Sequence, residues 1–159
     1  MSRLVQNPQT VDATSADRAP RVIAQSLAAD ERALTGKVCA LLAALGCDDA
    51  TRAAAWWYAL ARAHPGIWAA QSRGLSESVR RLVEGQLEAE RVWMLHAQRG
   101  DHGGAEGLRR LLLAIIRDLR VVYLLLARQL AEMRAATALP EAQRRELALR
   151  PRDIHGPLA

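Results

Sequence analysis

The most apolar stretch of the chain, residues 108–134, constrains the fold most strongly. Its sequence is LRRLLLAIIRDLRVVYLLLARQLAEMR, and polar residues interrupt it at Arg117–Arg120 and at residues 128–132. Every residue from Val121 to Ala127 is apolar, so a helix here has no solvent face and belongs in a core or a membrane. A membrane span needs roughly 20 uninterrupted apolar residues, which the first polar interruption prevents. We expect one buried central helix, or two helices with Asp118 as the N-cap between them.

The composition favours helices throughout. Half of the 159 residues are apolar, phenylalanine is absent, and the bulk of the apolar side chains comes from leucine, alanine and four tryptophans. Alanine, leucine and arginine are strong helix formers, and no run of β-branched residues indicates a strand. We predict a polar lead-in over residues 1–20 and one all-α domain over residues 21–159, a multi-helix bundle around a buried central helix pair.

Apolar periodicity and turn residues locate the helices along the chain. The predicted ranges are 21–33, 38–45, 51–63, 75–98, 108–138 and 139–150. Gly36 is expected to divide the first two helices, and Gly46 to end the second. Asp48 or Asp49 is expected to cap the third helix, and residues 67–74 to form a loop or a single turn.

The net charge of +5 raises the possibility of a nucleic-acid surface. The basic residues are nearly all arginine, with Lys37 the only lysine, and they neither form long runs nor alternate with aromatic residues. Arginines scattered among acidic residues are more typical of solvated helix faces.

The two cysteines, Cys39 and Cys47, form no CxxC motif. A chain that can build an apolar core and has so few cysteines is expected to keep them as reduced thiols. The N-terminus also lacks the apolar segment of a signal peptide. We therefore expect a cytoplasmic protein that does not enter a membrane.

Seven segments of the chain match, in order and spacing, the sequence motifs of a known family of bacterial proteins. They are GCDDATRAAA (46–55), SESVRRLVEG (76–85), AEGLRRLLLA (105–114), DLRVV (118–122), LARQLAEMR (126–134), LPE (139–141) and DIHGPLA (153–159). Together they resemble the RelA/SpoT family, which makes and destroys the alarmone (p)ppGpp. The fifth segment, for example, is similar to the family's LADRLHNMR. The resemblance covers residues 34–159.

The resemblance implies an N-terminal helical HD domain. In active relatives this domain removes the 3′-pyrophosphate from (p)ppGpp with a Mn²⁺ ion, which polarises a phosphoryl oxygen and activates a water molecule. The family supplies an early histidine, an adjacent His-Asp pair, an acidic pair one turn later, and the distant aspartate of the LADR segment.

This chain departs from the family pattern at each of those positions. The early histidine is matched by Leu34, the His-Asp pair by Tyr58-Ala59, the acidic pair by Arg62-Ala63, the aspartate by Arg128, and the following Asn by Glu132. Arg128 would place a permanent cation where the metal belongs. The resemblance therefore implies a pseudo-hydrolase of the RelA type, without catalytic residues, a metal or another cofactor of its own.

Two local hypotheses follow from the replacements. The large side chains of Trp56, Trp57 and Tyr58 are expected to fill the emptied cleft, so that it is closed or much reduced. Arg128 and Glu132 are four residues apart on a helix and are expected to pair.

The resemblance also implies a role and partners. The chain would regulate (p)ppGpp synthesis in the stringent response as a domain of a RelA-like GTP pyrophosphokinase, and it would stop just before the synthetase domain that it contacts. The ribosome or tRNA would be reached through the parent protein. Trp68 and Trp93 are candidate contact residues.

Two alternatives remain open at the level of sequence. One is an active Mn²⁺-dependent (p)ppGpp 3′-pyrophosphohydrolase whose ligands lie elsewhere, among His64, His96, His102 and His155, although the chain contains no His-Asp step. The other is a non-catalytic module that binds a guanine nucleotide, with phosphates held by Arg62, Arg128 and Arg134.

Overall fold

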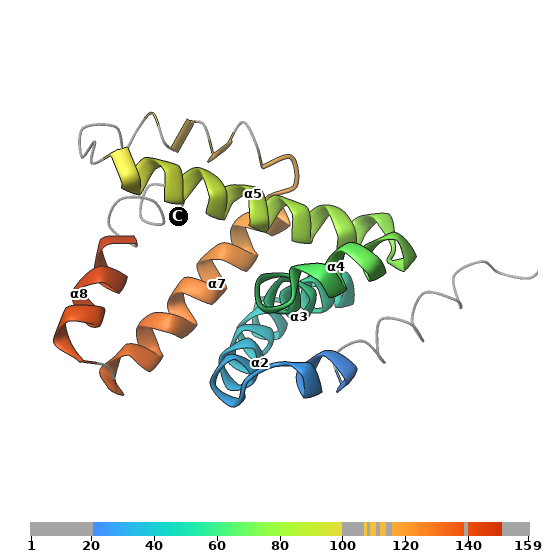
Figure 1. Cartoon of the computed structure of the whole chain (residues 1–159), viewed down its shortest axis with the longest axis horizontal. Coiled ribbons are helices and arrows are strands. Elements are labelled where there is room, and N and C mark those ends of the chain that lie inside the picture. The colour runs from blue at the N-terminus through green and yellow to red at the C-terminus, as the bar shows by residue number, and fades with distance from the viewer. Residues whose placement is uncertain are drawn as a thin grey trace, which may run out of the picture.

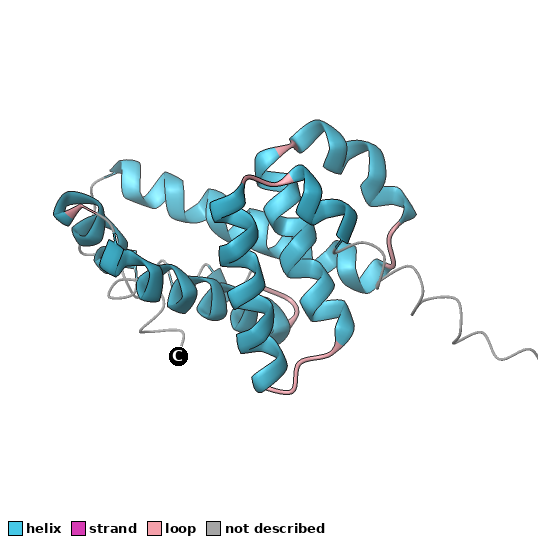
Figure 2. Cartoon of the chain, turned by 90° about the horizontal axis from the view of Figure 1, so that it is seen from below, coloured by secondary structure: helices cyan, strands magenta, loops and turns pink. Residues whose placement is uncertain are grey.

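A computed structural model describes residues 21–99, 107, 109–110, 112–113, 116–138 and 140–150, and in this part of the chain it contains helices and no strand (Figures 1 and 2). A helical segment at residues 21–26 precedes the named elements. These are α2 (Ala29–Ala44), α3 (Asp49–Ala63), α4 (Pro65–Gln71), η2 (Ser72–Gly74), α5 (Glu77–Arg99), α7 (Leu119–Ala135), η3 (Ala136–Ala138) and α8 (Glu141–Arg150). The predicted all-α class is confirmed. The predicted lead-in over residues 1–20 lies outside the described residues.

Helix α7 lies at the centre of this arrangement. It contacts α2 on one side, α5 at its N-terminal end and α8 near its C-terminal end, while α3 packs against α2, α4 and α5 (Figure 1). Leu42 of α2, Leu82 of α5 and Leu124 of α7 have no solvent exposure and meet in one hydrophobic core. The buried side of α3 is rich in alanine, whose small side chains allow neighbouring helices to approach closely.

Of the two predicted alternatives, two helices with Asp118 as the N-cap between them is the one that agrees with the structure, and a single helix over residues 108–138 is wrong, because residues 116–118 are not helical. The backbone of Asp118 is extended, and its side chain accepts a hydrogen bond of 3.0 Å from the backbone N–H of Arg120 at the start of α7. The expectation of a helix with no solvent face is wrong at Tyr123, which is 43% exposed. The reason is the position of α7: neighbouring helices cover only part of its circumference, and Leu130 and Met133 are also exposed.

Local capping sets the boundary between α2 and α3, as predicted. Gly46 has a positive φ of 73°, and the N–H groups of Gly46 and Cys47 bond the carbonyls of Ala43 and Leu42 at 3.0 and 2.9 Å. This is the Schellman arrangement, in which glycine takes the left-handed conformation without a steric penalty. Asp48 then caps α3 by accepting a 2.8 Å bond from the N–H of Thr51.

Two further predicted boundaries are wrong. Gly36 does not divide two helices, because α2 runs through it and the break falls at residues 27–28. A single glycine costs a helix only about 1 kcal/mol, and tertiary packing of the flanking turns offsets that cost. Residues 67–74, predicted as a loop or a single turn, belong to the seven-residue helix α4 and to η2. Pro65 is the first residue of α4, a position where the missing proline N–H has no helical partner to lose.

The crossing of α5 and α7 depends on Gly85. A Cβ atom at this position would lie 2.8 Å from Cγ2 of Val121, which is 2% exposed and, as a β-branched residue, has few other rotamers. Gly85→Ala is expected to lower the free energy of unfolding by about 1–3 kcal/mol through overpacking, as measured by urea denaturation. Gly36→Ala is the matched control, because no atom lies within 4 Å of its added Cβ. That change is expected to stabilise by about 0.5–1 kcal/mol, and an equal gain from Gly85→Ala would contradict the close contact.

Arg120 joins the N-terminal ends of three helices. Its guanidinium group donates to Asp118 at 2.7 Å, to Asp48 at 2.9 Å and to the hydroxyl of Ser78 in the first turn of α5 at 3.1 Å. The hydrogen bond from Thr51, supported by Arg120, lowers the pKa of Asp48, and the hydrogen bond from Arg120 lowers that of Asp118. Both aspartates therefore ionise more readily in the folded chain than in the unfolded chain.

This junction predicts a loss of stability in acid. A carboxyl whose pKa is lowered by folding stabilises fully above its usual value of 3.8, and the contribution disappears as the pH falls through the lowered pKa. Both carboxylates are partly in water, so each is expected to contribute at most about 1 kcal/mol. Unfolding curves of the native chain and of Asp48→Asn/Asp118→Asn should differ at neutral pH and converge in strong acid. A constant difference across the pH range would contradict this account.

Candidate functional site

A buried arginine on α7 is the centre of the site that the sequence singled out. The side chain of Arg128 is 11% exposed, and its two terminal nitrogens donate to the two carboxylate oxygens of Glu31 at 2.8 and 3.1 Å. Its Nε donates to Glu132 at 3.0 Å, so the predicted pair four residues apart is confirmed. Glu31 lies in the first turn of α2, where a negative charge favours the helix N-terminus. The contact thus ties α2 to α7.

Tyr58 of α3 packs against the same guanidinium group. The guanidinium carbon of Arg128 lies 5.4 Å from the centroid of the Tyr58 ring, and that of Arg62 lies 5.7 Å from it. The Tyr58 hydroxyl donates to Glu90 of α5 at 3.0 Å, and Arg62 forms an ion pair with Glu90 at 3.1 Å. Four helices therefore contribute side chains to one network. We call it the Arg128 cluster: Glu31, Tyr58, Arg62, Glu90, Arg128 and Glu132.

The surroundings fix the protonation states in this cluster. Burial by itself disfavours the charged form of Arg128, but the hydrogen bonds that Arg128 donates to Glu31 and the negative charges of Glu31 and Glu132 outweigh it and raise the pKa of Arg128 above its usual value. Burial, together with the negative charge of Glu90, raises the pKa of Tyr58. Arg128 is therefore a permanent cation and Tyr58 a neutral hydrogen-bond donor. Neither can exchange a proton near neutral pH, as general acid–base catalysis requires.

The structure places the seven positions matched to the family's active site as follows. Tyr58, Arg62, Arg128 and Glu132 come together in the Arg128 cluster. Ala59 is buried in the core, Leu34 is partly buried and packs against the same core, and Ala63 is the exposed last residue of α3. Of the three large side chains predicted to fill the cleft, Tyr58 is 4% exposed and lies in the Arg128 cluster, Trp57 is 7% exposed and packs near Trp68, and Trp56 is only partly buried.

Sequence reasoning missed two members of the cluster, Glu31 and Glu90. Glu31 is 97 residues from Arg128 in the chain, and Glu90 is 32 residues from Tyr58. One signal in the sequence could have pointed to them: a buried arginine must be paired with a group of opposite charge. That signal calls for carboxylates near Arg128 but does not say which of the 17 acidic residues supply them.

The residues present do not fit the Mn²⁺ ion that the RelA/SpoT resemblance implies for active members of that family. At the matched ligand positions, Leu34 and Ala59 have no donor atom, Tyr58 offers a neutral phenol, and Arg128 repels a cation. Within the described ranges, no three His, Cys, Asp or Glu side chains are grouped so that they could hold a metal ion. His64 is exposed and lies between α3 and α4, where its Nε2 is 2.9 Å from the carbonyl oxygen of Ser26.

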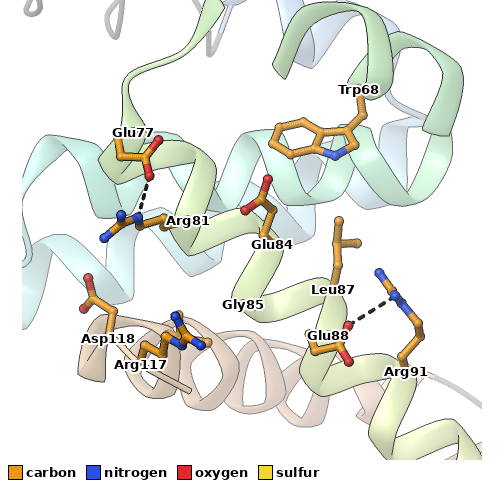
Figure 3. Close-up of a pocket in the computed structure, with 11 residues that line it drawn as sticks. Trp68, Glu77, Arg81, Glu84, Gly85, Leu87, Glu88, Arg91, Arg117 and Asp118 are labelled. Carbon is orange, nitrogen blue, oxygen red and sulfur yellow. Dashed lines mark hydrogen bonds and ion pairs between the residues drawn. The ribbon is translucent and has the colours of Figure 1, made fainter. Parts of the chain in front are cut away.

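A surface pocket lies elsewhere, along α5 (Figure 3). It has a volume of about 590 Å³ and contains none of the seven matched positions. Its lining residues are Trp68, Glu77, Arg81, Glu84, Gly85, Leu87, Glu88, Arg91, Arg117, Asp118 and Val121. Charges pair along its wall, Arg81 with Glu77 and Arg91 with Glu88, so the wall presents no concentrated charge of one sign.

Three of the predicted contact or binding residues, Trp68, Arg62 and Arg128, have internal roles. Trp68 lines the α5 pocket, but its ring centroid also lies 6.3 Å from that of Trp57, and it packs against the core. The guanidinium groups of Arg62 and Arg128, proposed for nucleotide phosphates, are engaged by glutamates. Both observations favour structural roles for these side chains over ligand binding.

Within the part of the chain that is described, no helix has the length and apolar character needed to cross a membrane.

Comparisons with known proteins agree with the helical architecture. A search of curated proteins found no match. The HD domain model matches residues 19–159, which is most of the chain. The chain therefore belongs to the HD domain family.

Proposed function

We propose that this chain is a catalytically inactive HD domain of a RelA-like GTP pyrophosphokinase, where it regulates (p)ppGpp synthesis in the stringent response. In this proposal it is a pseudo-hydrolase without a metal or other cofactor, and the ATP-dependent pyrophosphate transfer belongs to the downstream synthetase domain of the parent protein. The order and spacing of the seven segments described above support the RelA/SpoT assignment.

The observation that carries the proposal is the engagement of Arg128. At the position matched to a metal-binding aspartate, the chain has a cation that is buried and held by Glu31 and Glu132. A divalent cation at this place would meet electrostatic repulsion from Arg128, and the nearest carboxylates are already committed to the guanidinium group. Tyr58-Ala59, where relatives have His-Asp, adds no ligand to offset that repulsion.

The proposed partner is the downstream synthetase domain of the same protein, with the ribosome or tRNA reached through the parent. A domain that keeps its fold but catalyses no reaction can still regulate a neighbouring domain by binding to it. The Arg128 cluster suits such a role, because it links four helices and would make the domain a stiff body.

A cytoplasmic location is part of the proposal. Cys39 and Cys47 are both free thiols. Burial raises the pKa of Cys39 to about 11, and this keeps the thiol protonated near neutral pH. Since the thiolate is the reactive form, Cys39 is expected to be inert.

The decisive experiment is a Mn²⁺-dependent (p)ppGpp hydrolysis assay on this chain beside an HD-containing relative that retains all metal ligands. The expected result is no product above the blank and no retained Mn²⁺, whereas the relative turns over. Turnover by this chain would overturn the proposal and redirect attention to its histidines.

Two further assays test the regulatory part of the proposal. The chain added to a RelA-type synthetase domain should change the rate of (p)ppGpp synthesis, and an unchanged rate would count against regulation by contact.

Guanine nucleotides should not raise the melting temperature of this chain. Stabilisation of about 2.7 kcal/mol, expected at 100 times Kd, would instead favour a nucleotide-binding module.

A further inference from the structure

We infer that Glu31, Glu132 and Tyr58 form a binding site for a planar guanidinium cation, and that its resident ligand is the side chain of Arg128. The inference concerns the chemical selectivity of the site and does not depend on the regulatory role proposed above. It follows from the way in which three separate groups contact one head group.

The carboxylates contact the N–H groups along the edge of the guanidinium group, and an aromatic ring covers one of its faces. Two N–H groups meet the two oxygens of Glu31 at 2.8 and 3.1 Å, which is the parallel two-bond geometry typical of arginine–carboxylate pairs. The Nε–H meets Glu132 at 3.0 Å. The ring of Tyr58 covers the guanidinium group, with 5.4 Å between the guanidinium carbon and the ring centroid. Such a distance is within the range of cation–π attraction.

The site is built independently of the arginine that occupies it. Glu31 comes from α2 and Tyr58 from α3, and the hydroxyl of Thr35 supports Glu31 with a 3.4 Å bond. The side chains of Glu31 and Glu132 are only 26% and 16% exposed. Without the Arg128 head group, two largely desolvated carboxylates would therefore face a space of guanidinium size, and this arrangement attracts a replacement cation.

The geometry selects a guanidinium ion over a metal ion. Its carboxylates are set for parallel N–H donors, and its third wall is an aromatic face, which suits a flat, delocalised and weakly hydrated cation. Mn²⁺ prefers several oxygen or imidazole ligands around one point. In the native chain the tether gives Arg128 a high effective concentration, so free guanidinium cannot compete, and the site becomes accessible only when the tethered group is removed.

Chemical rescue of Arg128→Ala tests the inference. Guanidinium or methylguanidinium chloride at low millimolar concentration should raise the melting temperature of this variant along a saturating curve. The folded-to-unfolded ratio should rise about tenfold at a guanidinium concentration about nine times Kd. The native chain should show only the weak denaturing effect of the salt. Equal rescue by sodium chloride would indicate ionic screening, and stronger rescue by MnCl₂ would indicate a metal site; either result would overturn the inference.

Further variants keep the test decisive. If Arg128→Ala does not fold, Arg128→Ala/Glu132→Gln removes one unpaired charge while retaining Glu31 and Tyr58, and it should show the same selectivity for guanidinium. Adding Glu31→Gln to either variant should abolish the rescue. Arg80→Ala is the control for nonspecific binding, because Arg80 pairs with exposed glutamates and its loss should create no saturable site. Rescue that persists without Glu31, or that Arg80→Ala also shows, would contradict the assigned site.

Discussion

Arg128→Ala is expected to lower the free energy of unfolding by about 3–5 kcal/mol, because it leaves two largely buried carboxylates without their cation. The Arg128 side chain is 11% exposed, so water cannot replace the lost charge at little cost. Glu31 loses two hydrogen bonds and Glu132 loses one. The variant also loses the packing of the guanidinium group on Tyr58.

Urea denaturation of three variants separates this effect from a general loss of charge. Arg81→Ala removes an arginine that is 72% exposed and should change stability by about 1 kcal/mol or less. The triple variant Glu31→Gln/Arg128→Met/Glu132→Gln should lose less stability than Arg128→Ala, because no carboxylate remains unpaired. If Arg128→Ala were as mild as Arg81→Ala, the cluster would not be a structural link between α2 and α7.

Leu124→Ala is expected to destabilise the fold by about 2.7–5 kcal/mol, the range for a buried leucine that leaves a cavity. Leu124, in the N-terminal half of α7, is completely buried in the core. The loss combines the transfer free energy of the deleted methyl groups with the lost contacts of the atoms around the cavity.

Leu130→Ala is the matched control on the same helix. Leu130 is 40% exposed, so the same chemical change should cost much less, and both variants keep or improve the helix propensity of α7. The difference between the two in urea denaturation isolates the tertiary contribution. Equal losses would mean that α7 is not packed as the structure has it.

The helices were largely predictable because their signals are local. Gly46 and Asp48 define the boundary between α2 and α3, and Asp118 begins α7, each through bonds to residues no more than four positions away. Apolar periodicity gave the all-α class for the same reason. The pairing of Arg128 with Glu132 was also accessible, because residues four apart share a helix face.

Tertiary structure decided the features that depend on distant neighbours. The exposure of Tyr123 follows from which sides of α7 other helices cover, and the continuity of α2 through Gly36 follows from packing of its flanking turns. Neither is encoded in a local pattern, because burial depends on the rest of the chain.

The candidate site also has features that the sequence predicted and features that only the tertiary structure identified. The sequence by itself placed an arginine at position 128 and aromatic residues at 56–58. Through the RelA/SpoT resemblance, it also predicted that the metal ligands of an active HD domain are not retained at the matched positions. Only the tertiary structure showed that Glu31 and Glu90 complete the cluster, since they reach it across 97 and 32 residues of chain. The physical reason is that a buried charge demands a partner, but only the packing of α2, α3, α5 and α7 determines which carboxylate is near enough to serve.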